Sequence, residues 1–543
     1  MFRLLLAAAA LLSSLAQAQS LVLDNIKGYG WDGHKLVRFS RLVVQDGKVV
    51  ARGDARLAMP AGAEVRDLKG KTVIPGLIDA HGHLLGLGES ILNVDLAGSR
   101  SLAEALARVA RFAKAHPALP WIQGRGWNQE LWPDKRMPSA KDLDTLGDSR
   151  PVWLTRVDGH AGWANGAALR LAGIDAGTQA PAGGQILRGQ GGRPSGVLVD
   201  NAMALMEAKL PPLDQVQRQQ ALDAALAIMG QVGLTAMHDA GVDLPTWQLY
   251  LKNQDSLSAR LYVMLDGKDG TWAKVGKPQP WQGKDLLAGM AVKLYADGAL
   301  GSRGAALLAD YSDRPGQRGL MIFPPGELEK RMGAAAEAGF QVNVHAIGDA
   351  GNRRVLDGFA ALPEALRKGR RHRIEHAQVL ALSDIPRFAQ LGVIASMQPT
   401  HATSDMNMAE KRLGKERVKG AYAWRRLIDS GARLAAGSDF PVESPNPFFG
   451  LYSAVTRQDH QGQPPGGWYA DQALSREEAL YYFTRGAAYA GFMEDFTGSL
   501  APGQWADLLI LDQDYFQVPA AQIWQMKPRE TWLAGKAVYV RPQ

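Results

Sequence analysis

The segment that decides the fold is residues 73–83, whose sequence is VIPGLIDAHGH. The apolar run from Val73 to Ile78 predicts a buried β-strand, and His81 and His83 follow directly at its end. Side chains two residues apart on a strand share a face, so we expect both imidazoles to point the same way. One His-x-His pair alone is weak support for a metal site, so its meaning depends on what the rest of the chain brings near it.

Seven more short apolar segments follow along the chain, and helical patterns separate them. This alternation is typical of a parallel sheet with crossover helices, and eight strands predict a closed (β/α)8 TIM barrel of the α/β class. The further strands are predicted at Leu234–Met237, Leu261–Leu265, Val292–Tyr295, Gln341–Val344, Arg373–Ile374, Val393–Met397 and Leu434–Ala436.

A large insertion separates the first predicted strand from the second. It spans residues 84–230 and is rich in Gly, Pro and Trp. Because long structureless loops are rare in compact domains, we expect a lid or subdomain above the barrel mouth. Its tryptophans would either roof a pocket for an apolar group or form a core of their own: Trp121, Trp127, Trp132, Trp153 and Trp163.

Polar residues end three of the other predicted strands. His345 follows Gln341–Val344, His376 ends 372–375, and Asp439 ends 433–438. The carboxyl ends of parallel barrel strands meet at one rim, where catalytic residues of such barrels lie. Four histidines and a carboxylate at one rim predict a cation site suited to Zn, Mn or Fe.

Lys293 lies inside the predicted strand Val292–Tyr295. A buried ammonium group is unfavourable unless it is paired or neutralised. Two interpretations follow from the sequence. Either Lys293 reaches solvent or pairs with Asp297, or its amine is carboxylated by CO2 and becomes an anionic ligand that bridges two metals.

Both ends of the chain predict short strands and turns. Asp46-Gly47 lies between apolar segments, a strong hairpin pattern, and Ala534-Gly535 has the same place near the C-terminus. We therefore expect a small β-sandwich unit from residues 19–70 and 495–543, with the barrel over 71–494.

Residues 1–18 have the pattern of a secretory signal peptide: a basic start at Arg3, an apolar run over 4–12, and small residues at Ala16 and Ala18. The alternative is a buried N-terminal helix. Cleavage after Ala18 would place the protein outside the cytoplasm, in the bacterial periplasm. The chain has no cysteine, so disulfides, thiolate ligands and a lipid anchor on cysteine are excluded.

The formal net charge of +7 is small for 543 residues. No Lys/Arg-rich tract with interleaved aromatic residues occurs, so the sequence gives little support for nucleic-acid binding. No apolar segment after residue 18 is long enough to anchor the chain in a membrane. The expected partner is a small-molecule substrate, and the sequence is compatible with a homodimer.

Three motifs carry a resemblance to a known family: PGLIDAHGH at 75–83, VKLYADGALGSR at 292–303 and AAGSDFP at 435–441. The mature chain is similar over almost its whole length to the amidohydrolase superfamily. Within it, the chain resembles the amidohydrolase-3 branch of YtcJ-like proteins and N-substituted formamide deformylases. The resemblance implies one or two divalent metals, with zinc expected before Mn or Fe.

The resemblance also implies a role for each candidate ligand. His81, His83 and Asp439 would bind the first metal, and His345 and His376 the second. Lys293, carboxylated, would bridge the two. The implied reaction is hydrolysis of a C–N bond (amide, N-formyl or N-acyl amine, not peptide) by metal-activated hydroxide, with Asp439 as general base and then acid. Alternatives are an ester, lactone or cyclic urea hydrolase on the same site, and a non-catalytic periplasmic binding protein.

Five further residues are candidates for contact with substrate: His160, His238, Arg303, Gln398 and His401. His160 lies in the insertion and would otherwise stabilise its loop. His238 ends the second strand, and Gln398 and His401 follow the seventh. Arg303 follows a Gly-rich turn and would pair either with a substrate carboxylate or with Asp297 or Asp310.

Overall fold

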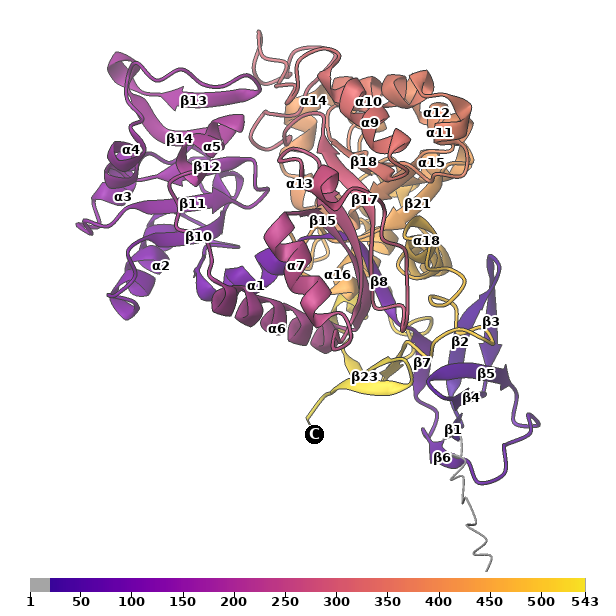
Figure 1. Cartoon of the computed structure of the whole chain (residues 1–543). Helices are drawn as coiled ribbons and strands as arrows, with labels where there is room; N and C mark the ends of the chain where they lie inside the picture. The colour runs from indigo at the N-terminus through magenta and orange to yellow at the C-terminus, as the bar shows by residue number, and fades with distance from the viewer. Residues whose placement is uncertain (1–19, 543) are drawn as a thin grey trace, which may run out of the picture.

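The computed structural model describes residues 20–542 (Figure 1). The predicted signal peptide, residues 1–18, lies outside the described residues. Among the described residues, no helix combines the length and the apolar character needed to cross a membrane.

The centre of the molecule is a barrel of eight parallel strands, as the sequence predicts. They pair in chain order, and a parallel bridge between Gly82 and Phe440 joins the two ends of the sheet. The strands are β8 (Leu77–Gly82), β15 (Leu234–Val242), β16 (Arg260–Asp266), β17 (Leu287–Tyr295), β18 (Gln341–Ala346), β19 (Arg373–His376), β20 (Ile394–Met397) and β21 (Arg433–Ala436).

Helices cover the outside of the barrel, and their ends follow from local sequence. In α6 (Gln215–Val232), the Asp214 side chain accepts from the Gln217 backbone N–H, and Gly233 ends the helix with φ of 92°. These are a capping box and a left-handed C-terminal glycine. The other outer helices include α7 (Leu244–Asn253), α9 (Glu327–Glu337), α10 (Asp349–Ala361), α12 (Ile385–Leu391), α15 (Trp424–Asp429), α16 (Pro447–Thr456) and α18 (Arg485–Ala490).

The first predicted strand is divided, which corrects its boundary. Residues 72–75 form β7, which pairs with the C-terminal strand β22 (Leu508–Leu511), and the barrel strand β8 begins at Leu77. The division falls at Gly76, where a Cβ atom would lie 2.2 Å from Thr235 Oγ1. Only glycine fits that close approach, and the chain passes there from one sheet to the other.

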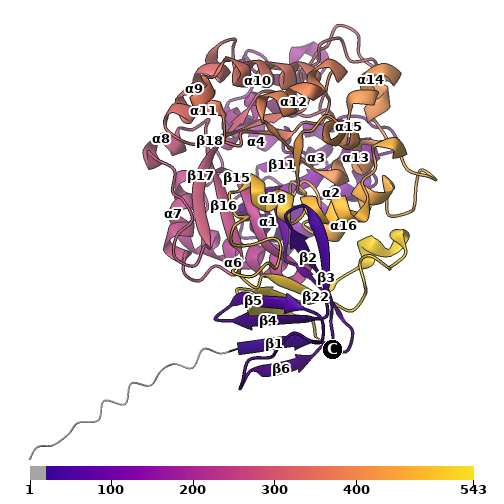
Figure 2. The same ribbon diagram turned by 90° about the vertical axis from the view of Figure 1, so that its right-hand side faces the viewer.

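The two ends of the chain form β-sheets beside the barrel (Figure 2). The first sheet has the order β5-β4-β1-β6 and the second β24-β23-β22-β7-β2-β3. Asp46 and Gly47 have φ of 51° and 78° at the predicted hairpin turn. The strands are β1 (Ser20–Asp24), β2 (Lys27–Asp32), β3 (Lys35–Phe39), β4 (Arg41–Gln45), β5 (Lys48–Gly53), β6 (Glu64–Asp67), β7 (Thr72–Pro75), β22, β23 (Pro528–Leu533) and β24 (Lys536–Val540).

Within the insertion, residues 94–200 fold into a sheet of their own, which we name the lid (Figure 1, left). The helix before the lid, α1 (Leu84–Leu92), packs against α6 so closely that a Cβ atom at Gly88 would lie 1.9 Å from the Ala221 carbonyl oxygen. The lid strands, in spatial order, are β13 (Gly184–Arg188), β14 (Pro194–Asp200), β12 (Ala161–Ala164), β11 (Val152–Arg156), β10 (Ile122–Trp127) and β9 (Val94–Asp95).

The predicted tryptophans pack mainly inside the lid. Trp127, Trp132 and Trp163 are almost fully buried, with ring centroids 6.2 to 6.5 Å apart. Trp121 and Trp153 belong to a second apolar cluster on the lid, and Trp153 also reaches the central cavity. Most of these rings therefore stabilise the lid itself.

Candidate metal centre and active site

A cavity of about 1280 Å³ lies between the barrel mouth and the lid. Five of the six predicted ligands line it, and His81 is buried beside them. The strand ends that supply them are those of β8, β17, β18, β19 and β21, and the lining ligands are His83, Lys293, His345, His376 and Asp439.

The ends of β8 and β21 are fastened to each other by Asp79. Its carboxylate accepts hydrogen bonds from the backbone N–H groups of His81 and Ser438 at 3.0 Å, and from the Ser438 hydroxyl at 2.6 Å. The Asp439 N–H donates to the His81 carbonyl at 2.7 Å. These buried bonds hold His81 and Asp439 in register, although they lie far apart in the sequence.

His81, His83 and Asp439 form a compact cluster. Asp439 Oδ1 lies 3.6 Å from His81 Nε2 and 3.1 Å from His83 Nε2. The opposite ring nitrogens face acceptors: His81 Nδ1 lies 2.6 Å from Glu375 Oε2, and His83 Nδ1 lies 2.9 Å from the Ala240 carbonyl. The protons therefore belong on Nδ1, which leaves two Nε2 lone pairs directed at a carboxylate oxygen.

That arrangement suits a divalent cation. Three acceptor atoms that converge in this way repel one another, and a cation among them removes the repulsion. Asp439 Oδ1 is buried and has no hydrogen-bond partner among the described residues. Two imidazole nitrogens and one carboxylate oxygen are the donor set of many zinc sites. The residues present thus fit the metal that the sequence predicts.

A chain of contacts between buried polar side chains, Glu375, Arg373 and His238, holds His81 in place on the side away from Asp439. Arg373 Nε lies 3.0 Å from Glu375 Oε1, and its Nη1 lies 2.8 Å from His238 Nδ1. The side chains of His81, Glu375 and Arg373 are fully buried. His238 was a candidate for substrate contact, and the structure corrects this: it lies in this chain of contacts and does not line the cavity.

His345 and His376 lie next to each other, with ring centroids 4.6 Å apart. His376 Nδ1 lies 2.8 Å from Gln398 Oε1, and His345 Nε2 lies 3.5 Å from the Gly298 carbonyl. Each ring therefore keeps one nitrogen free of these contacts. Gln398, a candidate for substrate contact, does not line the cavity and instead orients His376, which corrects its predicted role.

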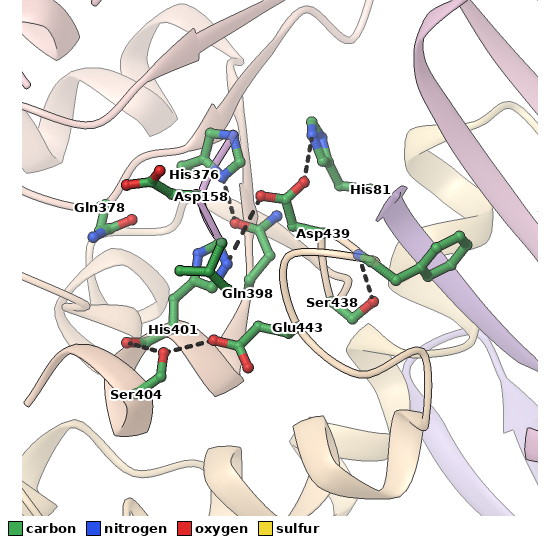
Figure 3. Close-up of polar contacts among 12 residues, drawn as sticks. His81, Asp158, His376, Gln378, Gln398, His401, Ser404, Ser438, Asp439 and Glu443 are labelled. Atoms are coloured by element: carbon green, nitrogen blue, oxygen red, sulfur yellow. Dashed lines mark hydrogen bonds and ion pairs between the residues drawn. The ribbon is translucent and has the colours of Figure 1, made fainter. Parts of the chain in front are cut away.

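His401 lies closer to the metal centre than a substrate contact alone would require. Its Nε2 is buried without a hydrogen-bond partner among the described residues and lies 3.8 Å from Asp439 Oδ2. His376, His401 and Asp439 each offer an atom within 4.8 Å of the others (Figure 3). From the sequence, His401 is a candidate for substrate contact after the seventh strand and is not among the predicted metal ligands.

Lys293 projects into the same space. Its Nζ lies 3.2 Å from His81 Nε2 and 4.9 Å from the centroid of the Tyr295 ring. It forms no ion pair with any residue of 20–542. The predicted partner Asp297 instead accepts hydrogen bonds from the backbone N–H groups of Ala306, Ile347 and Gly348. Burial lowers the pKa of the Lys293 amine to about 8.

The charges of the site follow from burial and neighbours. Burial lowers the pKa of His81, His345 and His376 well below the usual value, so these imidazoles are neutral, as metal ligands must be. Burial alone would raise the pKa of Asp439. The adjacent His83 and His81 outweigh burial and hold the pKa below its usual value, so the carboxylate is ionised.

The two remaining candidates for substrate contact, His160 and Arg303, differ in whether they line the cavity. His160 lines the cavity, its Nδ1 lies 2.7 Å from Asp200 Oδ1, and its ring lies 4.9 Å from that of His345. Arg303 does not line the cavity. Its guanidinium pairs with Asp313 at 2.9 Å, a partner that differs from the predicted Asp297 and Asp310. The predicted contact with a substrate carboxylate stays a prediction, and in this structure Asp313 occupies the guanidinium.

Comparison with known proteins agrees with this geometry. A sequence model described as Amidohydrolase family matches residues 64–539. The putative amidohydrolase YtcJ of Bacillus subtilis is 33% identical over 520 residues, which cover 92% of this chain and 96% of that protein. The N-substituted formamide deformylase of Arthrobacter pascens is 27% identical over 523 residues, which cover 92% and 95%.

A solved structure is similar over almost the same range. An uncharacterized metal-dependent hydrolase from Pyrococcus horikoshii superposes with a TM-score of 0.75 and 28% identity. The match covers 92% of this chain and 99% of that one. The barrel, the lid and the terminal sheets thus belong to one architecture found in both chains.

Proposed function

The chain belongs to the amidohydrolase family, and from this premise we propose that it hydrolyses the C–N bond of a small amide, N-formyl or N-acyl amine. The observation that carries the proposal is the convergence of His81 Nε2, His83 Nε2 and Asp439 Oδ1 at the barrel mouth. The N-substituted formamide deformylase of A. pascens, similar over the whole barrel, supports the choice of bond.

We propose zinc as the metal. His81, His83 and Asp439 would hold one ion, and His345 and His376 would hold a second together with carboxylated Lys293. Bound there, a divalent cation supplies two things: it lowers the pKa of water and polarises the scissile carbonyl. Neutral imidazoles and an ionised Asp439 are the protonation states that such binding needs.

Asp439 is the proposed proton carrier. Its Oδ1 is directed at His81 and His83. Its Oδ2 faces His401 (Figure 3). Oδ2 is therefore placed to accept the proton of the attacking water and to deliver it to the leaving amine. His160 and His401 also line the cavity, and we propose that they contact the carbonyl side of the substrate.

Carboxylation of Lys293 is supported by its surroundings. A buried amine that has no ion pair with a described residue and a pKa of about 8 is partly neutral near pH 7, and only the neutral amine attacks CO2. The Nζ–C bond forms, a proton leaves for solvent, and the cation becomes an anionic carbamate. The change of sign removes the repulsion between the ammonium group and a metal.

Metal content with a substrate panel tests the proposed function. The protein is purified without chelators and with bicarbonate, its metals are measured by elemental analysis, and it is assayed on N-formyl and N-acyl amines. About two equivalents per chain and turnover of at least one of them are expected. Turnover of only esters, lactones or cyclic ureas would reassign the bond. No metal after reconstitution and no turnover would overturn the proposal in favour of a binding protein.

We also propose that residues 1–18 direct export and are removed, because their composition is that of a signal peptide. Expression of the full chain in a Gram-negative host, followed by N-terminal sequencing of the periplasmic fraction, tests this. A mature protein that begins at Gln19 is expected. Retention of Met1 in a cytoplasmic protein would show that the segment is not a leader.

A further inference from the structure

The lid contributes one arginine to the cavity whose surroundings differ from those of the others. Four lid arginines form ion pairs, and the remaining five are exposed at the surface. Arg125 belongs to neither group: it lines the cavity, is only partly exposed, and forms no ion pair with any of residues 20–542. The ion-paired arginines are Arg108 with Glu104, Arg136 with Asp142, Arg150 with Asp148 and Arg156 with Asp158.

The guanidinium of Arg125 has few hydrogen bonds for a half-buried cation. Its Nη2 donates to the Val157 carbonyl at 3.1 Å. Its Nε is buried and finds no acceptor in the part of the chain that the structure describes. A guanidinium carries five N–H donors, and leaving buried donors unpaired is unfavourable. Such a group in a cavity is suited to an anion that brings its own acceptors.

The backbone is built to direct this side chain. Strand β10 has a register shift between Arg125 and Trp127, and Gly126 between them has φ of 100°. A Cβ atom at Gly126 would lie 2.6 Å from the Ala97 N–H nitrogen, so glycine is needed there. Trp127 fixes the far side of this bulge by donating from Nε1 to the Leu154 carbonyl at 2.7 Å. Bulges of this kind re-aim a side chain.

Arg125 lines the same cavity as the metal-site residues His83, His345 and Asp439. Burial lowers its pKa, and among the charges that oppose this effect the carboxylate of Asp439 is the strongest, ahead of Asp158 and Glu89. The same cavity is also lined by carboxylates of the barrel (Asp405 and Glu443) and of the lid (Asp95 and Asp158), which would repel an anion. An anionic group is therefore favoured beside Arg125, because the other cavity-lining arginine, Arg156, is already paired with Asp158.

We propose that Arg125 binds a carboxylate of the substrate, so that the enzyme prefers amides that carry a carboxylate. This inference rests on the proposed function, because the scissile bond must lie at Asp439 while the carboxylate lies at the lid. An arginine fork matches the two oxygens of a carboxylate, which fixes the orientation of the substrate as well as its charge.

Substrate pairs that differ only in charge test the proposal. N-formylglycine is compared with N-formylglycinamide, which places the carboxylate on the amine side of the bond. Succinamic acid is compared with succinamide, which places it on the acyl side. The wild-type enzyme is expected to favour the charged member of one pair by about 10- to 100-fold in kcat/KM, and the pair that shows this identifies the side.

Variants assign the preference to Arg125. Arg125→Met is expected to abolish it by slowing the charged substrate alone, and Arg125→Lys to retain part of it, since lysine keeps the charge but not the fork. Arg136→Met, which removes an ion-paired lid arginine, is the matched control and should leave the preference intact. Circular dichroism and the melting temperature confirm that each variant is folded.

The outcomes separate this inference from the proposed function. If wild type hydrolyses amides without a charge preference, or if Arg125→Met slows both members of a pair equally, the carboxylate site is wrong while the proposed function stands. If no amide is hydrolysed, calorimetric binding of N-formylglycine and N-formylglycinamide decides the matter. Tighter binding of the charged molecule, lost in Arg125→Met, supports the site, and equal binding overturns it.

Discussion

The barrel rim and the lid face the same cavity but are stabilised in different ways. At the rim, polar side chains hold one another: Glu375 orients His81, Gln398 orients His376, and Asp79 ties β8 to β21. In the lid, buried tryptophans form the core, and single polar side chains such as Arg125 reach the cavity from it. A change in the rim should therefore disturb the reaction itself, whereas a change in the lid should alter which substrate is chosen.

This division has a physical basis. Rim groups share buried hydrogen bonds, so removing one leaves its neighbours unsatisfied and displaces them. A lid side chain at the end of a bulge can be shortened without disturbing the apolar core behind it. The following predictions test the contrast, beginning with the rim, where the expected effects are largest.

Asp439→Asn is expected to reduce kcat by at least about 1,000-fold for every substrate, because the amide cannot accept a proton from water. Substrate should still bind, and equilibrium binding measured beside steady-state kinetics checks this. The control is Asp357→Asn, which changes an exposed carboxylate on α10. Near-normal turnover in Asp439→Asn would remove this residue from the reaction.

Lys293→Met is expected to lower kcat/KM by about 100-fold, a loss of about 2.7 kcal/mol in transition-state stabilisation, since the second metal loses its bridging ligand. Elemental analysis should show metal falling from two equivalents to one. Lys368→Met, at an exposed surface pair, is the control. Full activity with two metals would show that Lys293 bridges nothing.

The same lysine gives a pH dependence. Its amine pKa is lowered to about 8, so the neutral form that reacts with CO2 becomes more abundant as pH rises through 8 and then reaches a plateau. Metal-free enzyme is incubated with ¹³C-bicarbonate, with the total bicarbonate adjusted so that dissolved CO2 is the same at each pH. Under these conditions it should gain a carbamate NMR signal more rapidly at pH 9 than at pH 7. The signal should be absent in Lys293→Met. A rate independent of pH at fixed dissolved CO2 would contradict this.

Glu375→Gln is expected to weaken metal binding by about 10- to 100-fold, the usual consequence of losing a carboxylate behind a ligating histidine. Glu375 touches neither substrate nor cavity, so it is a positioning residue. Chelator competition measures the metal Kd, and activity at saturating metal should recover largely. Glu364→Gln, on an exposed helix, is the control. An unchanged metal Kd would mean that Glu375 does not orient His81.

The contrast also explains what the sequence could predict. Apolar runs between helical patterns predict the strands, and His345, His376 and Asp439 follow from their places at strand ends. The division at Gly76 was missed, because the terminal sheet and the barrel share one apolar run over 73–78. The supporting roles of Glu375 and Gln398 depend on contacts between strands, and Arg125 lies beside a bulge in β10. No local pattern carries this information.

Arg303 gives the smallest expected effect and tests the contrast most directly. From the sequence, Arg303 is equally suited to bind a substrate carboxylate or to form an ion pair. In the structure it pairs with Asp313, which also pairs with the buried Arg412. Asp313 therefore keeps a cation when Arg303 is removed, and a partly exposed pair contributes at most about 1 kcal/mol. Arg303→Met should change kcat/KM less than about twofold for charged and neutral substrates alike. If Arg303→Met lost the preference for charged substrates while Arg125→Met kept it, carboxylate recognition would belong to a barrel loop and not to the lid.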